Sequence, residues 1–86
     1  MNDTIPWDIE IDARGLLCPL PVLKARKRLS TMGNGAVLRL VATDPAAVID
    51  VPHYCRESGN ELIGSVPLGS APDGTATAYL IRRIKT

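Results

Sequence analysis

The segment Cys18-Pro19-Leu20-Pro21 holds the residues of this chain that are best suited to chemistry. A cysteine thiolate is the nucleophile of sulfur and disulfide chemistry. We expect a helix to begin here with Cys18 as its N-cap, because Pro19 suits the first helical position, where the missing N–H costs nothing. The sulfur then lies at the positive end of the helix dipole, near the Leu20 N–H, and the two rigid prolines hold it outward. The pattern predicts an exposed, activated thiol; the alternative is a small buried cysteine that only packs.

Basic residues surround this cysteine along the sequence. The helix dipole alone is worth about 0.3–1 kcal/mol, too little to ionise most of a thiol whose ordinary pKa is about 8.5. We therefore expect nearby cations, above all Arg14 and Arg26, to lower the pKa of Cys18. The same residues form either a solvated helix face or a docking surface for an acidic partner. Between Asp12 and Asp44 no acidic residue occurs and six basic ones do, namely Arg14, Lys24, Arg26, Lys27, Arg28 and Arg39.

The second cysteine, Cys55, follows Val48 and Val51 at helical spacing, so we expect it to pack in the core, with a resolving thiol as the alternative. His53 is expected at the surface. Two cysteines and one histidine are too few for a zinc site, and we expect no metal and no cofactor. No apolar run approaches the roughly 20 residues that cross a bilayer, and no secretory pattern opens the chain. We expect a cytoplasmic protein with free thiols and no membrane contact.

The 86 residues, 45% hydrophobic and 22% charged, predict one globular domain over 1–86, with 1–6 as a flexible tail. Alternating apolar residues predict strands, and apolar residues three and four apart predict helices. Pro52 is expected to break the second helix, because it clashes with the carbonyl four residues before it. The expected elements are a strand over Trp7–Ala13, a helix from Pro19 that stops at Gly33-Asn34-Gly35, a strand over Ala36–Thr43, helical pieces over Pro45–Ile49 and Pro52–Ser58, a strand over Glu61–Val66, a loop over Pro67–Gly74 and a strand over Thr75–Ile84.

This β-α-β-α-β-β order predicts an α+β fold, a two-layer sandwich in which both helices cover one face of a mixed four-stranded sheet. The first two strands are joined by a helix, which suits a parallel crossover, and the last two form a hairpin. The residues expected to face the core are Trp7, Ile9, Ile11 and Ala13 in the first strand, Val22, Ala25, Leu29 and Met32 in the first helix, and Leu38, Leu40 and Ala42 in the second strand.

The chain closely resembles the TusA family of sulfur carriers, also called SirA-like proteins. The resemblance runs from about Trp7 to Ile84. It rests on the run from Asp12 to Leu23 with its C-P-x-P motif, on Arg26-Lys27, and on Asp44-Pro45, Asp50-Val51-Pro52, Tyr54-Cys55, Glu61-Leu62 and Tyr79-Leu80-Ile81-Arg82.

The resemblance implies a sulfurtransferase activity of the relay type. Cys18 would accept a persulfide sulfur from a cysteine desulfurase or a rhodanese-like donor and pass it to an acceptor protein, as in tRNA thiolation. It further implies that Arg26 and Asp44 contact partners, and the charge pattern adds Arg14, Lys24 and Lys27 as residues that contact partners or stabilise the thiolate. Leu20 departs from the tRNA-thiolating members, which carry an acidic residue there, so other sulfur pathways stay open.

Two other function classes compete with the carrier. The expected sandwich resembles the C-terminal domain of a bacterial translation initiation factor, and the basic helix suits an RNA-binding module. An aromatic content of 3% with no phenylalanine and a nearly neutral charge argue against RNA, so we expect no direct nucleic-acid binding beyond a weak, salt-dependent term. A purely regulatory interaction module would have no use for the exposed Cys-Pro turn.

Overall fold

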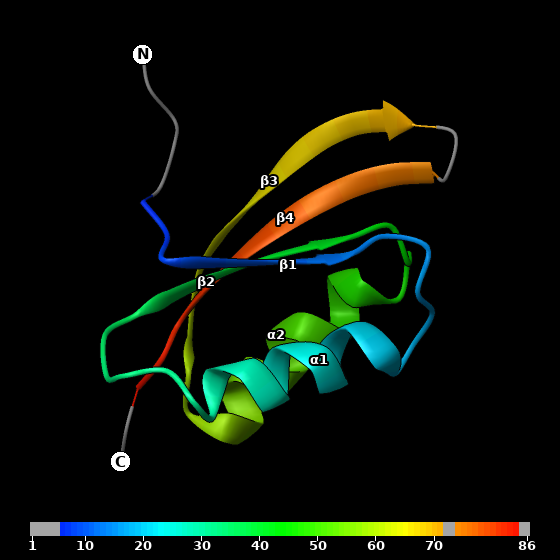
Figure 1. The fold of residues 1–86 in the computed structure, drawn as a ribbon. Helices are drawn as coiled ribbons and strands as arrows, with labels where there is room; N and C mark the ends of the chain where they lie inside the picture. The colour runs from blue at the N-terminus through cyan, green and yellow to red at the C-terminus, as the bar shows by residue number, and fades with distance from the viewer. Residues whose placement is uncertain (1–5, 72–73, 85–86) are drawn as a thin grey trace.

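The computed structural model describes residues 6–71 and 74–84, so the predicted tail lies almost wholly outside the described part. The sheet has the order β1-β2-β4-β3, with β1 parallel to β2 and the other neighbours antiparallel. Both helices lie on one face of it (Figure 1), which confirms the predicted α+β sandwich. The elements are β1 (Ile9–Ala13), α1 (Leu20–Leu29), β2 (Val37–Ala42), α2 (Ala47–Ser58), β3 (Glu61–Ala71) and β4 (Gly74–Arg82).

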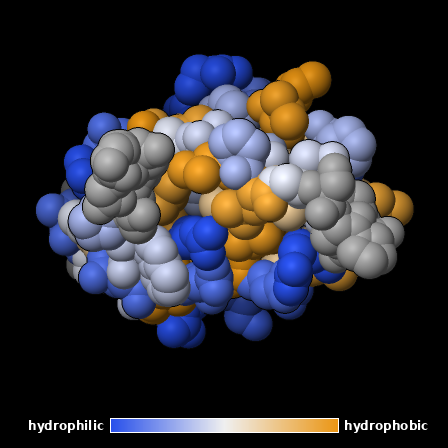
Figure 2. Space-filling model, turned by 90° about the horizontal axis from the view of Figure 1, so that it is seen from above, coloured by the Kyte–Doolittle hydropathy of each residue, from blue (hydrophilic) through white to orange (hydrophobic). Residues whose placement is uncertain are grey.

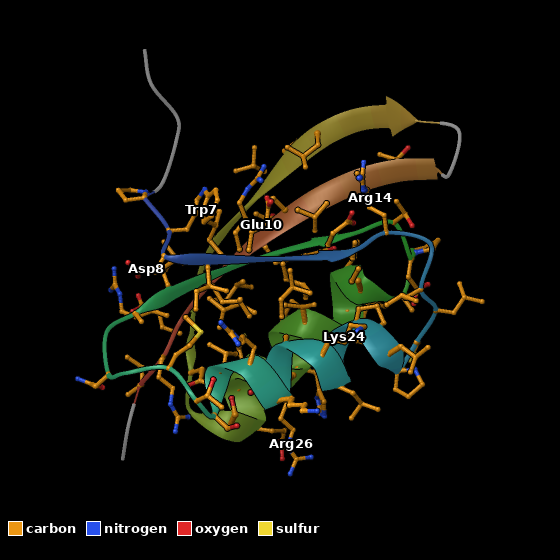
Figure 3. The ribbon with its side chains drawn as sticks, viewed as in Figure 1. Trp7, Asp8, Glu10, Arg14, Lys24 and Arg26 are labelled. Atoms are coloured by element: carbon orange, nitrogen blue, oxygen red, sulfur yellow. The ribbon has the colours of Figure 1, made fainter. Side chains whose placement is uncertain are left out.

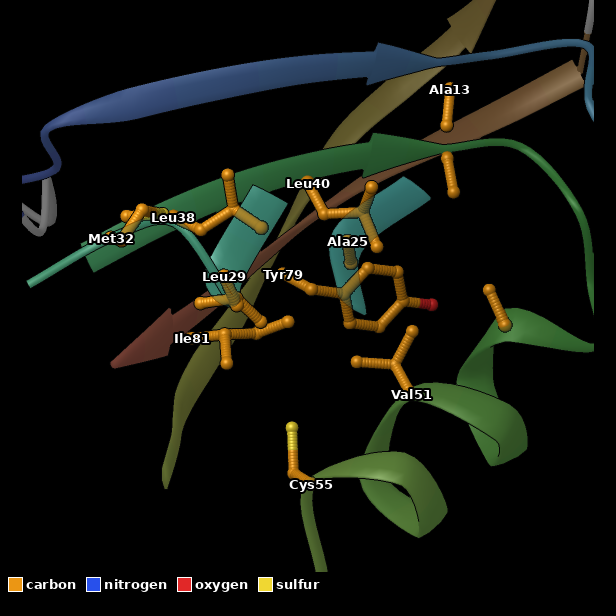
Figure 4. Packing of buried hydrophobic residues seen from close by; sticks show 12 residues of the cluster. Ala13, Ala25, Leu29, Met32, Leu38, Leu40, Val51, Cys55, Tyr79 and Ile81 are labelled. Atoms are coloured by element: carbon orange, nitrogen blue, oxygen red, sulfur yellow. The ribbon is translucent and has the colours of Figure 1, made fainter. Parts of the chain in front are cut away.

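The core lies between the helices and the sheet (Figure 4). Side chains alternate across a strand, so the helix-facing residues of β2 are the predicted Leu38, Leu40 and Ala42, all buried. The predicted helix stripe is also confirmed: Ala25 and Leu29 are buried, as is Met32 just beyond the end of α1, and Val22 is partly buried against the cluster.

The other face of the sheet carries a smaller apolar cluster of Val41, Ala76 and Ala78, with Val66 packed against it. In Figure 2, which looks down on this face, hydrophobic side chains gather near the middle and hydrophilic ones lie around them. No helix in the described residues is long and apolar enough to cross a membrane.

The first strand is shorter than predicted, and Trp7 does not join the core. The chain bends at Asp8, whose carboxylate accepts a hydrogen bond from the Val37 N–H at 2.8 Å. Trp7 is 42% exposed and lies under the Arg39 guanidinium, 5.7 Å from the ring centre. The bend therefore removes Trp7 from the alternation that places Ile9, Ile11 and Ala13 toward the helices.

The predicted break at Pro52 is wrong, because α2 is one continuous helix with Pro52 inside it. A proline at this position removes only the hydrogen bond to the Val48 carbonyl. Val48 is 63% exposed, so water can satisfy that carbonyl. The helix ends as expected at Gly59, whose φ of 83° is a left-handed conformation that favours glycine.

The predicted loop over Pro67–Gly74 is also wrong, since β3 and β4 extend as a long hairpin through most of it. Pro67 is compatible with β3 because this strand lies at the edge of the sheet, where a missing N–H breaks no ladder. The register shifts near Leu62 and again near Gly69, which has a φ of 85°. The proline and the glycine that suggested a loop, Pro67 and Gly69, therefore lie within β3, where Gly69 accompanies an irregularity in its pairing with β4.

Candidate active site

The connection between β2 and α2 fixes the segment that carries Cys18. One carboxylate oxygen of Asp44 accepts a hydrogen bond from the Cys18 N–H at 2.6 Å, and the other accepts from the Ala46 N–H at 3.1 Å. Next to it, the Thr43 hydroxyl accepts from the Gly15 N–H at 2.9 Å. Asp44 therefore ties the loop before α1 to the start of α2. This is an internal contact, while its predicted contact with a partner stays a prediction.

The helix α1 begins later than predicted. Its N-cap is Pro19, which follows a cis peptide bond, and its first residue is Leu20, so Cys18 precedes the N-cap. The Leu20 N–H donates to the Leu17 carbonyl at 2.9 Å and not toward the sulfur, contrary to the prediction. The prolines occupy the N-cap and second helical positions, where absent N–H groups break no helical hydrogen bond.

The environment of the Cys18 thiol is acidic, which overturns the predicted lowering of its pKa. The carboxylate of Asp50, in the first turn of α2, accepts a hydrogen bond from the thiol and raises the pKa of Cys18 above its ordinary value. Loss of hydration and the negative charges of Asp50 and Asp44 raise this pKa further. The charged groups that shift the pKa of Cys18 are therefore the carboxylates of Asp50 and Asp44, which the fold brings close to the thiol, and not the predicted Arg14 and Arg26.

Cys18 lies at a hollow of about 290 Å³ between the start of α1 and one side of α2. Helix α1 contributes no charged group to it. The Tyr54 hydroxyl accepts a hydrogen bond from the side-chain amide of the buried Asn60 at 3.2 Å, so it is already engaged. Besides Cys18, the hollow is lined by Pro19, Val22, Asp50, His53, Tyr54 and Glu57, and His53 is exposed as predicted.

The predicted basic residues separate into different regions. Arg14 pairs with Asp12 at 3.0 Å, and this pair holds the pKa of Asp12 at about 2. Figure 3 shows Arg14 on the face of the sheet away from the helices and Arg26 on the side of α1 turned away from the sheet. Lys24 and Lys27 line another hollow, of about 270 Å³, with Arg28, Thr31 and Ile11 of β1. The structure brings none of these cations into the hollow that Cys18 lines.

Cys55 lies in the core, as predicted. It is 4% exposed, and burial raises the pKa of its thiol to about 11. In Figure 4 its side chain points into the core, on the side of α2 from which Val51 also projects. Cys18, by contrast, is exposed.

Two exposed apolar side chains lie within two residues of Cys18 in the chain, and two more lie at the start of α2, the helix that carries Asp50; this exposure was not predicted. We call Leu17, Leu20, Val48 and Ile49 the apolar collar; their exposed fractions run from 47% to 73%. Leu17 and Val48 line one hollow together, and Ile49 precedes Asp50, which contacts the thiol. The predicted apolar stripe of α2 was therefore wrong at Val48: the buried residues of this helix are Ala47, Val51 and Cys55, spaced four apart, and Val48 is exposed.

Asp50 was not predicted to lie near Cys18, because it belongs to another helix, α2, and nothing in the local sequence around Cys18 indicates which residues of that helix pack beside it. Within the described residues, no three side chains of His, Cys, Asp and Glu are grouped so as to hold a metal ion.

The chain is similar to known sulfur carrier and SirA-like proteins. Residues 9–82 match the family model described as sulfurtransferase TusA. The sulfur carrier protein TusA of Allochromatium vinosum is 49% identical over 59 residues, which cover 69% of this chain and 78% of that protein. The sulfur carrier protein TusA of Pseudomonas syringae is 37% identical over 81 residues, covering 94% and 90%. A crystal structure of a SirA-like protein from Desulfitobacterium hafniense superposes with a TM-score of 0.65 at 25% identity, covering 86% of this chain and 96% of that one.

Proposed function

Because this chain belongs to the TusA family of sulfurtransferases, we propose that it is a sulfur carrier whose Cys18 bears the sulfur as a persulfide. The donor is a cysteine desulfurase or a rhodanese-like protein, and the acceptor is a further protein of a sulfur relay. The observation that carries the proposal is the contrast between an exposed Cys18, held at its backbone N–H by Asp44, and a buried Cys55.

The transfer is an exchange at sulfur. The Cys18 sulfur attacks the terminal sulfur of the donor's persulfide, a new S–S bond forms on Cys18, and the donor's own S–S bond breaks, its electron pair leaving on the donor cysteine. One thiol becomes a persulfide while one persulfide becomes a thiol, so no external oxidant or reductant is required. The acceptor repeats the same exchange on the loaded Cys18.

Such an exchange needs direct contact between two proteins at Cys18, and the apolar collar is the surface that must meet the partner. Burying an exposed leucine or isoleucine side chain contributes about 1.5–3 kcal/mol. The basic residues Lys24, Arg26 and Lys27 lie further along α1, where they act on an acidic region of the partner through longer-range attraction.

Leu20 bears on the pathway. It is an exposed apolar residue within the C-P-x-P motif, 47% exposed, at the position where tRNA-thiolating members carry an acid. The collar therefore favours an acceptor with an apolar contact surface, and tRNA thiolation is one of several relays open to this carrier.

A relay assay tests the proposal. The protein is incubated with a cysteine desulfurase and isotopically labelled cysteine, separated from the donor, and mixed with a thiol acceptor. We expect the wild-type protein and Cys55→Ser to pass labelled sulfur on, and Cys18→Ser to pass none. Transfer of label by Cys18→Ser at the wild-type rate would refute the proposal.

A further inference from the structure

We propose that Asp50 takes the proton of the Cys18 thiol as its sulfur forms the new S–S bond, and returns that proton when the sulfur leaves. The inference rests on the proposed function and names a second residue for the same reaction. Cys18 and Asp50 line the same hollow, which no basic residue of α1 enters, and among the carboxylates near the thiol Asp50 has the strongest effect on it.

The two residues meet across two elements. Cys18 precedes α1 and is held at its backbone by Asp44, while Asp50 lies in the first turn of α2, where its N–H donates to the Ala46 carbonyl at 2.8 Å. Asp44 also accepts from the Ala46 N–H. One carboxylate therefore fixes both the thiol's backbone and the helical turn that presents the other carboxylate.

The other titratable groups around Cys18 fit the role less well. Both carboxylate oxygens of Asp44 already accept hydrogen bonds from backbone N–H groups, those of Cys18 and Ala46. Tyr54 already accepts from Asn60. His53 and Glu57 line the hollow from α2 but are exposed, and neither acts on the thiol as Asp50 does.

This placement solves a problem that the acidic surroundings create. Near neutral pH Cys18 is a thiol, and a thiol is a poor nucleophile until it loses its proton. A carboxylate in contact removes the proton during attack, so a free thiolate need not form beside two negative charges. The proton then passes from Asp50 to the departing donor thiolate, and the overall exchange is balanced.

The reverse step uses the same contact. When an acceptor thiol attacks the terminal sulfur on Cys18, its proton passes to Asp50, and the Cys18 sulfur leaves with the electron pair of the S–S bond. The acceptor's proton, taken up by Asp50, restores the Cys18 thiol. A leaving thiol of high pKa departs slowly unless it is protonated, so Asp50 assists unloading as well.

The test compares two reactions of the variant Asp50→Asn near pH 7. Alkylation by a small reagent uses only thiolate already present, so loss of the negative charge should make Cys18 alkylate several-fold faster. Single-turnover sulfur transfer from a persulfide-loaded donor should instead become about tenfold slower, because the proton acceptor is gone. A carboxylate that only repels the thiolate would make both reactions faster in the variant, which would overturn the inference.

The pH profile supplies a second criterion. The sulfur-transfer rates of the wild-type protein and of Asp50→Asn should approach each other as the pH rises through the pKa of Cys18, because the thiolate then forms without Asp50. If Asp50→Asn were slower by the same factor at every pH, the variant would have a structural defect and the inference would be contradicted. Glu57→Gln, which removes a carboxylate from the same hollow, should keep wild-type rates in both reactions. Failure of the wild-type protein itself to load sulfur on Cys18 would refute the proposed function, whereas normal loading by Asp50→Asn would refute only the role of Asp50.

Discussion

The two cysteines of this protein both have a raised pKa, for different physical reasons. At Cys55 the cause is burial alone, in the hydrophobic core. At Cys18 the largest cause is a hydrogen bond to the Asp50 carboxylate, at an exposed position. A raised pKa thus marks an inert thiol in one region, while in the other it accompanies a proton acceptor in contact with the thiol.

Alkylation of the native protein should separate the two thiols most widely. Near neutral pH we expect Cys18 to be labelled at least about a hundredfold faster than Cys55, because a reagent reaches Cys55 only when the structure opens. Peptide mapping after timed quenching measures both rates. Equal labelling would contradict the packing of Cys55.

Stability should show the opposite contrast. Cys55→Ser places a hydroxyl in an apolar core and should lower the free energy of unfolding by about 1–3 kcal/mol. Cys18→Ser, at an exposed position, should change it by no more than about 0.5 kcal/mol. Urea unfolding followed by circular dichroism measures both, and a larger loss for Cys18→Ser would place that side chain in the packing instead.

The surfaces around Cys18 should respond differently to salt. Ile49→Ser removes a collar side chain without changing charge, and it should raise the KM for the donor about tenfold at low and high salt alike. The double reversal Arg26→Glu with Lys27→Glu should slow sulfur acceptance mainly at low salt. Leu68→Ser, at an exposed leucine of β3, is the matched control and should have no effect. A salt-dependent defect in Ile49→Ser would argue against an apolar contact.

Arg14 should matter least. Its guanidinium pairs with Asp12 on the face of the sheet away from the helices. We therefore expect Arg14→Ala to leave the pH profile of Cys18 alkylation unchanged. A shift of that profile toward higher pH would restore the predicted role of Arg14 at the thiol.

The layers of the fold follow from the sequence because they rest on periodicity. Local residue spacing predicts which face of each element is buried: in β2 the buried residues alternate, as Leu38, Leu40 and Ala42 do, and in α1 they recur at helical spacing, as Ala25 and Leu29 do. Departures came where tertiary context outweighs a local rule: Pro52 costs one hydrogen bond on an exposed side of α2, and Pro67 lies in an edge strand.

The candidate site was only half predictable. The C-P-x-P segment marks Cys18 from local chemistry, but the charges that act on its thiol come from α2 and from the turn before it. Closeness in sequence favoured Arg14 and Arg26, whereas the fold places Asp44 and Asp50 beside the sulfur. Electrostatics at a loop depends on which elements pack against it, and periodicity does not specify that.

The most direct test of the central claim is to locate the transferred sulfur in the wild-type protein. The chain is loaded by a cysteine desulfurase with cysteine, trapped with an alkylating reagent without reduction, and digested for peptide mass analysis. We predict one added sulfur atom on the peptide that contains Cys18 and none on the peptide that contains Cys55. Sulfur on the Cys55 peptide, or an unmodified Cys18 after the donor has turned over, would contradict the account.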